Sequence, residues 1–191
     1  MKHQYTYSIH SNTGQPEEVP LILQRQRDIF STEDAESIKE ICRRDEWERN
    51  RTHQRETTFV YKTMETGWIY EKLEEKMFLA AEFFDFDVTG LEEPFRFIDY
   101  REGDNINTWH TDFGADGVGF YRKISASVDL SPTGSHNGGV DIFPDFVGEN
   151  RIRTTQGTGL FWPGNTYHRV PPLEVGLRSI LLAFGKGPPF R

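Results

Sequence analysis

The 191 residues are about as many as one domain contains, and the single cysteine, Cys42, excludes a disulfide framework or a thiolate metal cluster. The net charge is −8, and the basic residues form no stripe along the chain. Both observations argue against nucleic acid as a partner. No apolar run approaches the roughly 18 residues of a membrane span and the N-terminus has no signal-peptide pattern, so we expect a soluble, cytoplasmic protein with no membrane partner.

The N-terminal part is predicted to support a core that follows it. Residues 1–20 are polar and rich in turn formers, and we expect a loose arm there. Ordered structure is expected to begin with a strand at 21–23. Ser31 and Asp34 have the spacing of a capping box, which predicts a helix that continues to about residue 44.

A second helix is predicted further along the same part of the chain. The highly charged stretch 45–56 is expected to be an exposed loop, and a strand is expected at 57–61. Between residues 68 and 84, apolar residues recur at steps of about four, the pattern of a helix with one buried face. We expect this helix to pack on a sheet.

From residue 95 onward, short apolar and aromatic runs alternate with Gly, Pro, Asn and Asp turns, which favours strands. The predicted strands are 95–101, 106–111, 121–130, 139–143, 158–162, 167–170 and 177–185. Two helices followed by about seven strands predict an α+β, mainly β fold. We expect one domain over 1–191, with helical support at 21–94 and a β-sandwich core at 95–191.

Three residues have the types and spacing of a metal site. His110 and Asp112 are two positions apart, so on an extended strand both side chains point to one face. His168 follows 58 residues after His110. Two His and one carboxylate form the facial triad of non-haem Fe(II) oxygenases, which leaves the other side of the metal open to a cosubstrate and O₂. Taken singly, each residue is also explained by an ordinary hydrogen bond at a surface or turn.

Arg178 lies ten residues after His168, with turn-forming Pro and Gly residues between them. If the two flanking strands are antiparallel neighbours, both side chains can face one cavity. A guanidinium there would bind a carboxylate through two hydrogen bonds. An open metal beside such a cation is what 2-oxoglutarate requires, because its keto-acid end chelates the metal and its other end is a carboxylate. The alternative is a surface arginine.

These motifs resemble the prolyl-4-hydroxylase-like 2-oxoglutarate/Fe(II) dioxygenases, and in particular a small bacterial and phage-type branch. The segments that carry the resemblance are 100–112, 122–131, 137–139, 159–178 and 185–191. The match is close over 95–191, and the helices predicted before residue 95 fit the N-terminal support of the family loosely.

The resemblance implies a double-stranded β-helix (jelly-roll) fold. It implies Fe(II) bound by the His-Asp-His triad, 2-oxoglutarate and O₂ as cosubstrates, and ascorbate as a supporting reductant. It also implies that Arg178 binds the distal carboxylate of 2-oxoglutarate, and that Tyr100 contacts this cosubstrate. Ser127, on the predicted strand 121–130, is assigned to the same site.

The candidate substrate contacts are Trp109, Asp129 and Trp162. Either tryptophan could wall the pocket or pack in the core. Asp129 shares a strand face with Ser127, so it either pairs with a substrate cation in the cavity or faces solvent. Asp129 stands where close prolyl hydroxylases have a tyrosine, and Asp141 also departs from the family pattern, so the substrate is not carried over.

The predicted function is hydroxylation of an amino-acid side chain, in a proline-like peptidyl residue or in a free amino acid or similar small metabolite. The carboxylate of Asp112 favours hydroxylation over halogenation, which needs a small residue there. One alternative is a binding module or a redox-silent metal protein, which would not need Arg178. The other is an oxidative nucleic-acid demethylase, which would carry an arginine at the position of Phe184. The sequence leaves the oligomeric state open.

Overall fold

The computed structural model describes residues 8–10, 16–18, 23–52, 54–114, 117–145 and 148–189. Helix α1 spans Thr32–Cys42, helix α2 spans Gly67–Phe84, and a short 3₁₀ helix spans Gly117–Tyr121. The strands of the described residues are β1 (Ser8–His10), β2 (Pro16–Glu18), β3 (Gln24–Gln26), β4 (Glu48–Arg51), β5 (Glu56–Val60), β6 (Phe95–Tyr100), β7 (Ile106–His110), β8 (Arg122–Asp129), β9 (His136–Gly138), β10 (Asp141–Asp145), β11 (Gly148–Ile152), β12 (Gly159–Pro163), β13 (His168–Val170), β14 (Leu173–Gly176) and β15 (Arg178–Lys186).

Seven antiparallel strands form the main sheet, in the order β3-β12-β8-β15-β6-β5-β4. A second sheet has the order β11-β10-β13-β7, and β14 pairs with β9. From β6 onward the chain passes repeatedly between the two larger sheets. Strands β6, β8, β12 and β15 belong to the main sheet, whereas β7, β10, β11 and β13 belong to the four-stranded sheet.

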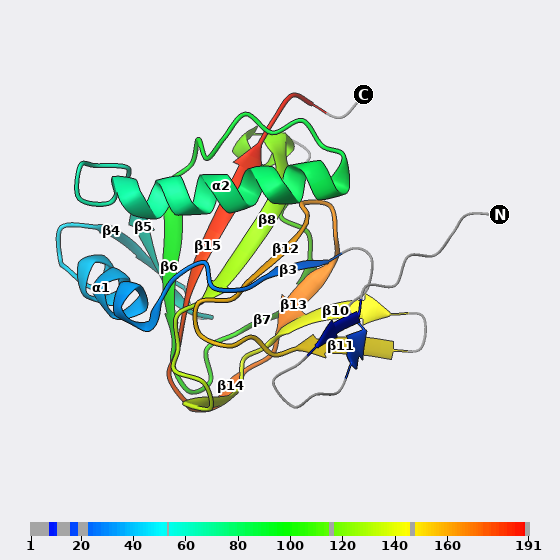
Figure 1. Ribbon diagram of the computed structural model, residues 1–191. Helices are drawn as coiled ribbons and strands as arrows, with labels where there is room; N and C mark the ends of the chain where they lie inside the picture. Colours follow the sequence, from blue (N-terminus) through cyan, green and yellow to red (C-terminus); the bar gives the residue numbers. More distant parts are fainter. Residues whose placement is uncertain are drawn as a thin grey trace.

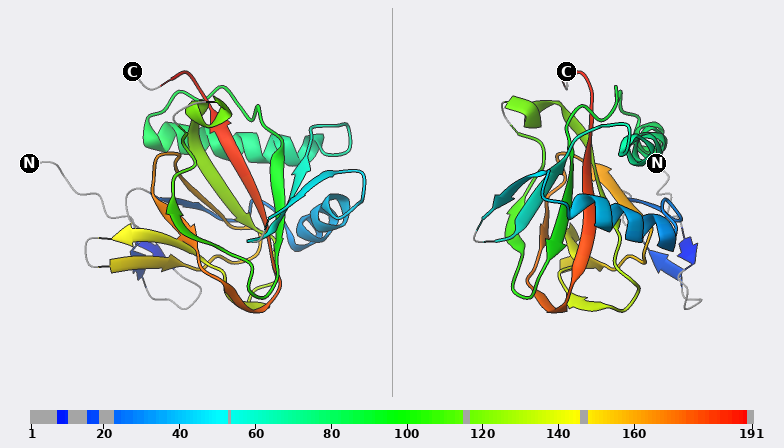
Figure 2. Two further views of the ribbon diagram at one scale, coloured as in Figure 1. Left: turned by 180° about the vertical axis from the view of Figure 1, so that it is seen from behind. Right: turned by 90° about the vertical axis from the view of Figure 1, so that its left-hand side faces the viewer.

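The main sheet is covered on both faces, so every residue of its strand β15 is buried. Leu181 and Ala183 belong to the apolar cluster formed with the two helices. Ile180, Leu182 and Phe184 belong to the cluster formed with β13 and β14. This alternation follows from the two-residue period of a strand. Figure 1 shows α2 across one face of the main sheet, and the reverse view in Figure 2 shows β7 and β13 on the other.

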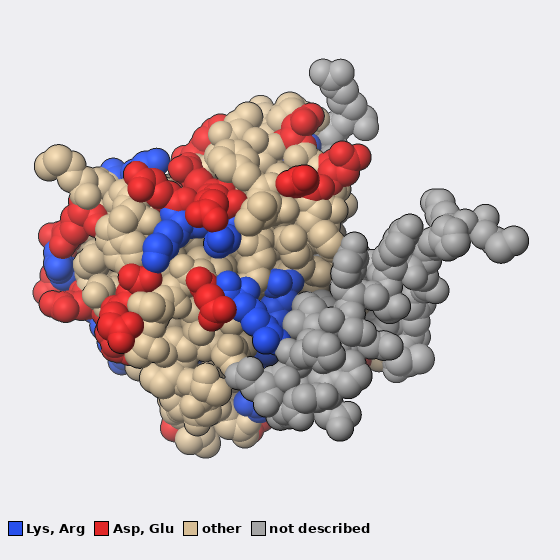
Figure 3. All heavy atoms as spheres, viewed as in Figure 1, with Lys and Arg blue, Asp and Glu red and all other residues tan. Residues whose placement is uncertain are grey.

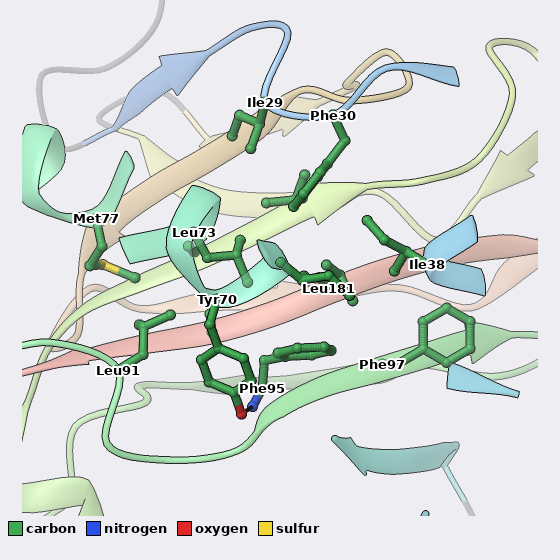
Figure 4. Close-up of a cluster of buried hydrophobic side chains, with 14 of the residues drawn as sticks. Ile29, Phe30, Ile38, Tyr70, Leu73, Met77, Leu91, Phe95, Phe97 and Leu181 are labelled. Atoms are coloured by element: carbon green, nitrogen blue, oxygen red, sulfur yellow. Dashed lines mark hydrogen bonds between the residues drawn. The ribbon is translucent and has the colours of Figure 1, made fainter. Parts of the chain in front are cut away.

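Both predicted helices are present. The capping box of α1 is formed, because Ser31 Oγ accepts a hydrogen bond from the Asp34 amide at 3.0 Å and the Asp34 carboxylate accepts one from the Ser31 amide at 3.1 Å. Helix α2 buries the predicted apolar stripe, which includes Ile69, Leu73 and Met77. Figure 4 shows Leu73 and Met77 in the cluster that joins this helix to the main sheet.

The seven strands predicted after residue 95 are all present, with bounds that differ by a few residues. The prediction of an exposed loop at 45–56 is wrong, because Glu48–Arg51 form β4. All four residues of β4 are exposed and the strand lies at the edge of the main sheet, where charged side chains are common. Such a strand has no buried face and therefore no alternating pattern in the sequence.

The N-terminal part differs in detail from the expectation. The strand expected at 21–23 is not found at Leu23, and β3 begins one residue later at Gln24; residues 21 and 22 lie outside the described part. Within the predicted arm, β1 and β2 form an antiparallel pair. The structure also adds β9, β11 and β14, which are short and contain several exposed polar residues, so the sequence pattern does not mark them.

Neither described helix combines the length and apolarity needed to cross a membrane. On the face shown in Figure 3, Asp and Glu are intermixed with Lys and Arg over the described residues. This face therefore offers no broad basic stripe of the kind that binds a phosphate backbone.

Candidate metal centre and its cavity

The three residues predicted to bind a metal come together. His110 is the last residue of β7 and His168 the first of β13, and the two are directly opposite in the antiparallel pair. Asp112 follows two positions after His110. One donor atom from each side chain lies within 4.8 Å of the others, and His168 Nε2 is 3.4 Å from Asp112 Oδ2. This convergence has the donor set of a facial metal site.

Both imidazoles are oriented by the chain just before them. His110 Nδ1 lies 2.9 Å from the Thr108 carbonyl oxygen, and His168 Nδ1 lies 3.0 Å from that of Thr166. Because a carbonyl only accepts, each Nδ1 carries a proton and each Nε2 keeps its lone pair for a metal. Burial, and then the neighbouring His168, lower the pKa of His110, which favours the neutral imidazole that a metal binds.

Asp112 is positioned by hydrogen bonds from the main sheet and by hydrogen bonds at its own backbone and the next residue. Ser125 Oγ, on β8, donates a hydrogen bond to Asp112 Oδ2 at 2.7 Å. Arg122 Nη1 donates to the Asp112 carbonyl oxygen at 3.3 Å, and the Phe113 amide donates to the Gly164 carbonyl oxygen at 2.8 Å. These bonds position the carboxylate beside the two imidazoles before any metal is present.

We expect Ser125→Ala to weaken Mn(II) binding about tenfold, because hydrogen-bond partners of metal ligands typically contribute 10- to 100-fold in affinity. Calorimetric titration with Mn(II) measures the change. Ser127→Ala is the matched control, since Ser127 lies two positions away on β8 and has no hydrogen bond to a metal ligand within the described residues. Equal Mn(II) affinity in Ser125→Ala and wild type would show that this bond does not orient the ligand.

His168 also lies against two aromatic rings. Trp162 packs edge-on at 4.9 Å between ring centroids, and Phe143 is stacked at 6.0 Å. The Trp162 and Phe143 rings are 5.3 Å apart. These contacts fix the imidazole plane and make one wall beside the triad apolar.

A cavity opens at the triad. Its lining residues are Arg55, Ile106, His110, Asp112, Ser127, Asp141, Trp162, His168, Val170, Ile180 and Leu182. Two buried polar atoms of this wall, Ser127 Oγ and Trp162 Nε1, have no hydrogen-bond partner within the described residues. Such atoms are uncommon in folded proteins. A polar ligand beside the metal would satisfy them, so the residues present fit a metal with a chelating cosubstrate.

Tyr100 lies opposite Arg178 in the β6–β15 pair and is fully buried. Its hydroxyl accepts a hydrogen bond from Arg55 Nη1. Burial raises the pKa of Tyr100, so the hydroxyl stays protonated and has a proton to donate. The Arg178 guanidinium carbon is 6.0 Å from the centre of the Tyr100 ring, so two guanidinium groups lie near this one side chain.

Arg178 is 1% exposed and is surrounded by acceptors. Its Nη2 donates to Asp141 Oδ2 at 2.6 Å, its Nη1 to the Gly139 carbonyl oxygen at 2.5 Å, and its Nε lies 3.5 Å from Asp129 Oδ2. Gly139 has φ +57°, a backbone conformation that favours glycine, and a Cβ there would lie 2.9 Å from Leu173. Burial by itself would lower the pKa of Arg178, but Asp141 and Asp129 raise it above its ordinary value.

The structure therefore places two predicted residues differently from the expectation. Arg178 does not line the cavity, whereas its partner Asp141 does. Asp129 does not face solvent, because it is buried against Arg178. Its carboxylate also accepts hydrogen bonds from the Ser131 amide at 2.8 Å and from Thr154 Oγ1 at 3.0 Å.

The two predicted tryptophans have different positions. Trp162 lines the cavity, as expected for a pocket wall. Trp109 is 36% exposed and lies under the guanidinium of Arg169, 5.0 Å from ring centre to carbon. Neighbouring residues of a strand point to opposite faces, so with His110 directed at the metal site Trp109 is directed away from it. Trp109 is therefore not brought to the cavity.

Sequence reasoning missed Arg55 and Phe143. Arg55 is 45 residues from Tyr100 in the chain and follows a stretch of exposed charged residues, so no local pattern distinguishes it. Phe143 looks like any core residue of a strand. Ser125 could have been noticed in the sequence, since it shares a strand face with Ser127 and Asp129. Its bond to Asp112, however, depends on how β8 lies against the segment after β7.

No protein family model matches the chain. Among curated proteins, a PKHD-type hydroxylase of Idiomarina loihiensis is 32% identical over 85 residues, which cover 44% of this chain and 38% of that protein. A PKHD-type hydroxylase of Nitrosomonas eutropha is 30% identical over 70 residues, which cover 36% of this chain and 31% of that protein. The chain thus matches about a third of the length of these relatives.

Solved structures are similar over most of the chain. A prolyl-4-hydroxylase of Pseudomonas putida has a TM-score of 0.66 at 17% identity, over 87% of this chain and 94% of that one. A viral collagen prolyl hydroxylase from Paramecium bursaria Chlorella virus-1, in a 2OG complex, has a TM-score of 0.66 at 14% identity, over 87% and 96%. An oxidoreductase of the 2OG-Fe(II) oxygenase family from Burkholderia pseudomallei has a TM-score of 0.68 at 12% identity, over 87% and 85%.

At these identities the structures show a shared fold, and the curated relatives add a likeness in sequence. The chain is thus similar in sequence to part of two PKHD-type hydroxylases and in fold to prolyl-4-hydroxylases and 2OG-Fe(II) oxygenases, which supports the family resemblance of the motifs.

Proposed function

We propose that this chain is a 2-oxoglutarate- and O₂-dependent Fe(II) hydroxylase that acts on a C–H bond of an amino-acid side chain. The coproducts are succinate and CO₂. The observation that carries the proposal is the convergence of two imidazoles and one carboxylate within 4.8 Å at the wall of a cavity. The curated relatives, which are named hydroxylases, support it.

We further propose that the two larger sheets form a double-stranded β-helix within one domain over 1–191. The passage of successive strands between the main and the four-stranded sheet supports this fold. In this proposal residues 95–191 form the core, and the segment 21–94 supports it through α2, which contacts β8, β12 and β15.

When bound, the metal with 2-oxoglutarate and O₂ supplies the oxidising power that amino-acid side chains lack. The chain's own residues position and shield that chemistry. The two Nε2 atoms and the Asp112 carboxylate would hold the metal at the wall of the cavity. The apolar residues Val170, Ile180 and Leu182, which line this cavity, limit the access of water.

For the substrate we propose a peptidyl residue such as proline first, and a free amino acid or similar small metabolite second. The ground for this order is that two of the similar structures are named prolyl hydroxylases. Trp162 is the candidate substrate contact that lines the cavity. Ascorbate stays a prediction from the family resemblance.

Anaerobic addition of 2-oxoglutarate to the Fe(II)-loaded protein tests the proposal. We expect a weak visible charge-transfer band, because the keto acid chelates the metal, and slow release of succinate once O₂ is admitted. His168→Ala should lose the band, since it removes a metal ligand. Tyr167→Ala is the matched control, because Tyr167 is the preceding residue and is 59% exposed.

No band in a folded, iron-loaded wild-type protein would contradict the proposal. The chain would then be a binding module or a redox-silent metal protein. A demethylase of nucleic acid is disfavoured by Phe184, which is buried under the guanidinium of Arg122 at 3.8 Å from ring centre to carbon.

A further inference from the structure

Arg96 is a cation beside the metal cavity whose hydrogen-bond donors are unused within the described residues. It lies on β6, and its Nε is a buried atom that has no hydrogen-bond partner there. Its ion pair is with Glu93, at 3.7 Å from Nη2, which is beyond the length of a hydrogen bond. A guanidinium has five N–H donors, and the Arg96 side chain is 23% exposed, so a ligand can reach it.

The main sheet places Arg96 next to the cavity. Across four of its strands, successive cross-strand partners form one row, which consists of Phe59, Arg96, Leu182 and Ser127. Directly opposite residues of antiparallel strands point to the same face of a sheet. Leu182 and Ser127 line the cavity, and Arg96 is the next residue of the row. Arg96 therefore lies on the face of the sheet that carries the metal site.

Two aromatic rings hold the guanidinium on this face. The guanidinium carbon of Arg96 is 4.8 Å from the centre of the Phe184 ring and 5.6 Å from that of Phe59. The guanidinium carbon of Arg122 lies 3.8 Å from the same Phe184 ring, and Arg122 Nη1 donates to the Asp112 carbonyl oxygen at 3.3 Å. A ring attracts a guanidinium through its charge and does not require its N–H donors. Arg96 is thus positioned toward the Asp112 side of the metal site with those donors still available.

Positive charge around Arg96 exceeds negative charge. The Glu93 carboxylate accepts a hydrogen bond from Arg122 Nε at 2.8 Å and lies 3.7 Å from the Lys186 ammonium. Within the described residues, this one carboxylate is the ion-pair partner of all three cations. Burial, and then the charge of Arg122, lower the pKa of Arg96, which agrees with a cation that is not fully balanced. An anion brought to Arg96 would complete the charge balance.

We propose that Arg96 binds a carboxylate of the substrate, so that the enzyme acts on an amino acid or a peptide that carries this anion close to the oxidised C–H bond. The inference rests on the proposed function and names the substrate class of that site. A guanidinium binds a carboxylate through two parallel hydrogen bonds, which fix both distance and direction. Such a contact beside the metal holds the reacting carbon in a defined place.

The test uses Mn(II)-loaded protein saturated with 2-oxoglutarate, so that the metal and its cosubstrate are in place and no turnover is needed. N-acetylproline offers a free carboxylate, and N-acetyl-aspartyl-prolinamide offers an acidic side chain. Each is compared with its neutral amide analogue, and NMR line broadening by Mn(II) reports binding near the metal. In the wild type we expect at least one anion to bind about 10- to 100-fold more tightly than its amide, the range for hydrogen bonds to a charged group. The anion that does so identifies the source of the carboxylate.

Arg96→Gln should abolish this preference and leave the affinity for 2-oxoglutarate within a few-fold of wild type. Arg96→Lys, which keeps the charge, should retain part of the preference. Arg44→Gln, which removes an exposed arginine paired with Glu65, is the matched control.

A preference for the anion that persists in Arg96→Gln would overturn the inference. The same holds if the wild type binds neither anion, or binds both no more tightly than their amides. In each of these cases the binding of 2-oxoglutarate leaves the proposed function standing. If the metal-loaded wild type does not bind 2-oxoglutarate, the proposed function fails and the inference fails with it.

Discussion

Replacing Arg178 alone by methionine is expected to destabilise the folded protein by about 3–5 kcal/mol, because removal of one partner leaves buried charges uncompensated. Asp141 would lose its closest cation, 2.6 Å away, and Asp129 its neighbour at 3.5 Å. Both carboxylates are almost fully buried, so little water reaches them to replace the guanidinium. Urea unfolding followed by tryptophan fluorescence measures the free energy of unfolding.

The double variant Arg178→Met with Asp141→Leu should regain most of this loss, since an apolar pair of similar size commonly replaces a buried ion pair at little cost. Asp129 keeps its hydrogen bonds from Ser131 and Thr154 in that variant. Arg44→Met, which breaks an exposed pair with Glu65, should cost less than about 1 kcal/mol. If Arg178→Met loses no more free energy of unfolding than Arg44→Met, the buried charges of Arg178, Asp129 and Asp141 do not depend on one another as described.

Asp112→Asn is expected to weaken Mn(II) binding by more than about 100-fold, because it removes the one negative charge of the donor set and a ligand usually contributes more than its hydrogen-bond partners. An amide is nearly isosteric with the carboxylate, so the fold should be unaffected. Calorimetry with Mn(II) gives the affinity, and circular dichroism checks the fold.

A combination with Ser125→Ala sharpens this experiment. The Ser125 hydroxyl acts through Asp112 Oδ2, which it contacts at 2.7 Å. Once that carboxylate is gone, Ser125→Ala should have almost no further effect on Mn(II) affinity, although it costs about tenfold alone. Additive losses in the double variant would mean that Ser125 reaches the metal by another route, and near wild-type affinity in Asp112→Asn would remove Asp112 from the metal site.

The sequence predicts those features that a short-range pattern of residues encodes. The strands of the core could be located because their apolar residues are bounded by Gly, Pro and Asn turns. The metal site could be located because His110 and Asp112 have the spacing of one strand face, and because their motifs and that of His168 resemble a known family. The structure then places His168 directly opposite His110. Strand β4 could not be located, since a fully exposed edge strand has no periodic pattern.

The sequence does not predict which charges pair across the fold. Asp129, Asp141 and Arg178 lie on three strands, and their meeting depends on the register and separation of those strands. The approach of Arg55 to Tyr100 likewise depends on how the β4–β5 turn is attached to the β6–β7 connection. Spacing along the chain identified Arg178 as a cation of the site, but only the structure shows that its charge is already balanced.

The carbonyl that orients each metal-facing imidazole lies just two residues earlier in the chain, at Thr108 for His110 and at Thr166 for His168. The hydrogen bond that places the Nδ1 proton is thus contained in a tripeptide, whereas the ring plane of His168 is also fixed by Trp162 and Phe143. Any antiparallel pair of strands that brings two such tripeptides into register would present two lone pairs to one point. The two histidines and the carbonyls before them therefore form a local motif. Another antiparallel sheet could carry this motif, and it could persist while the rest of the chain diverges.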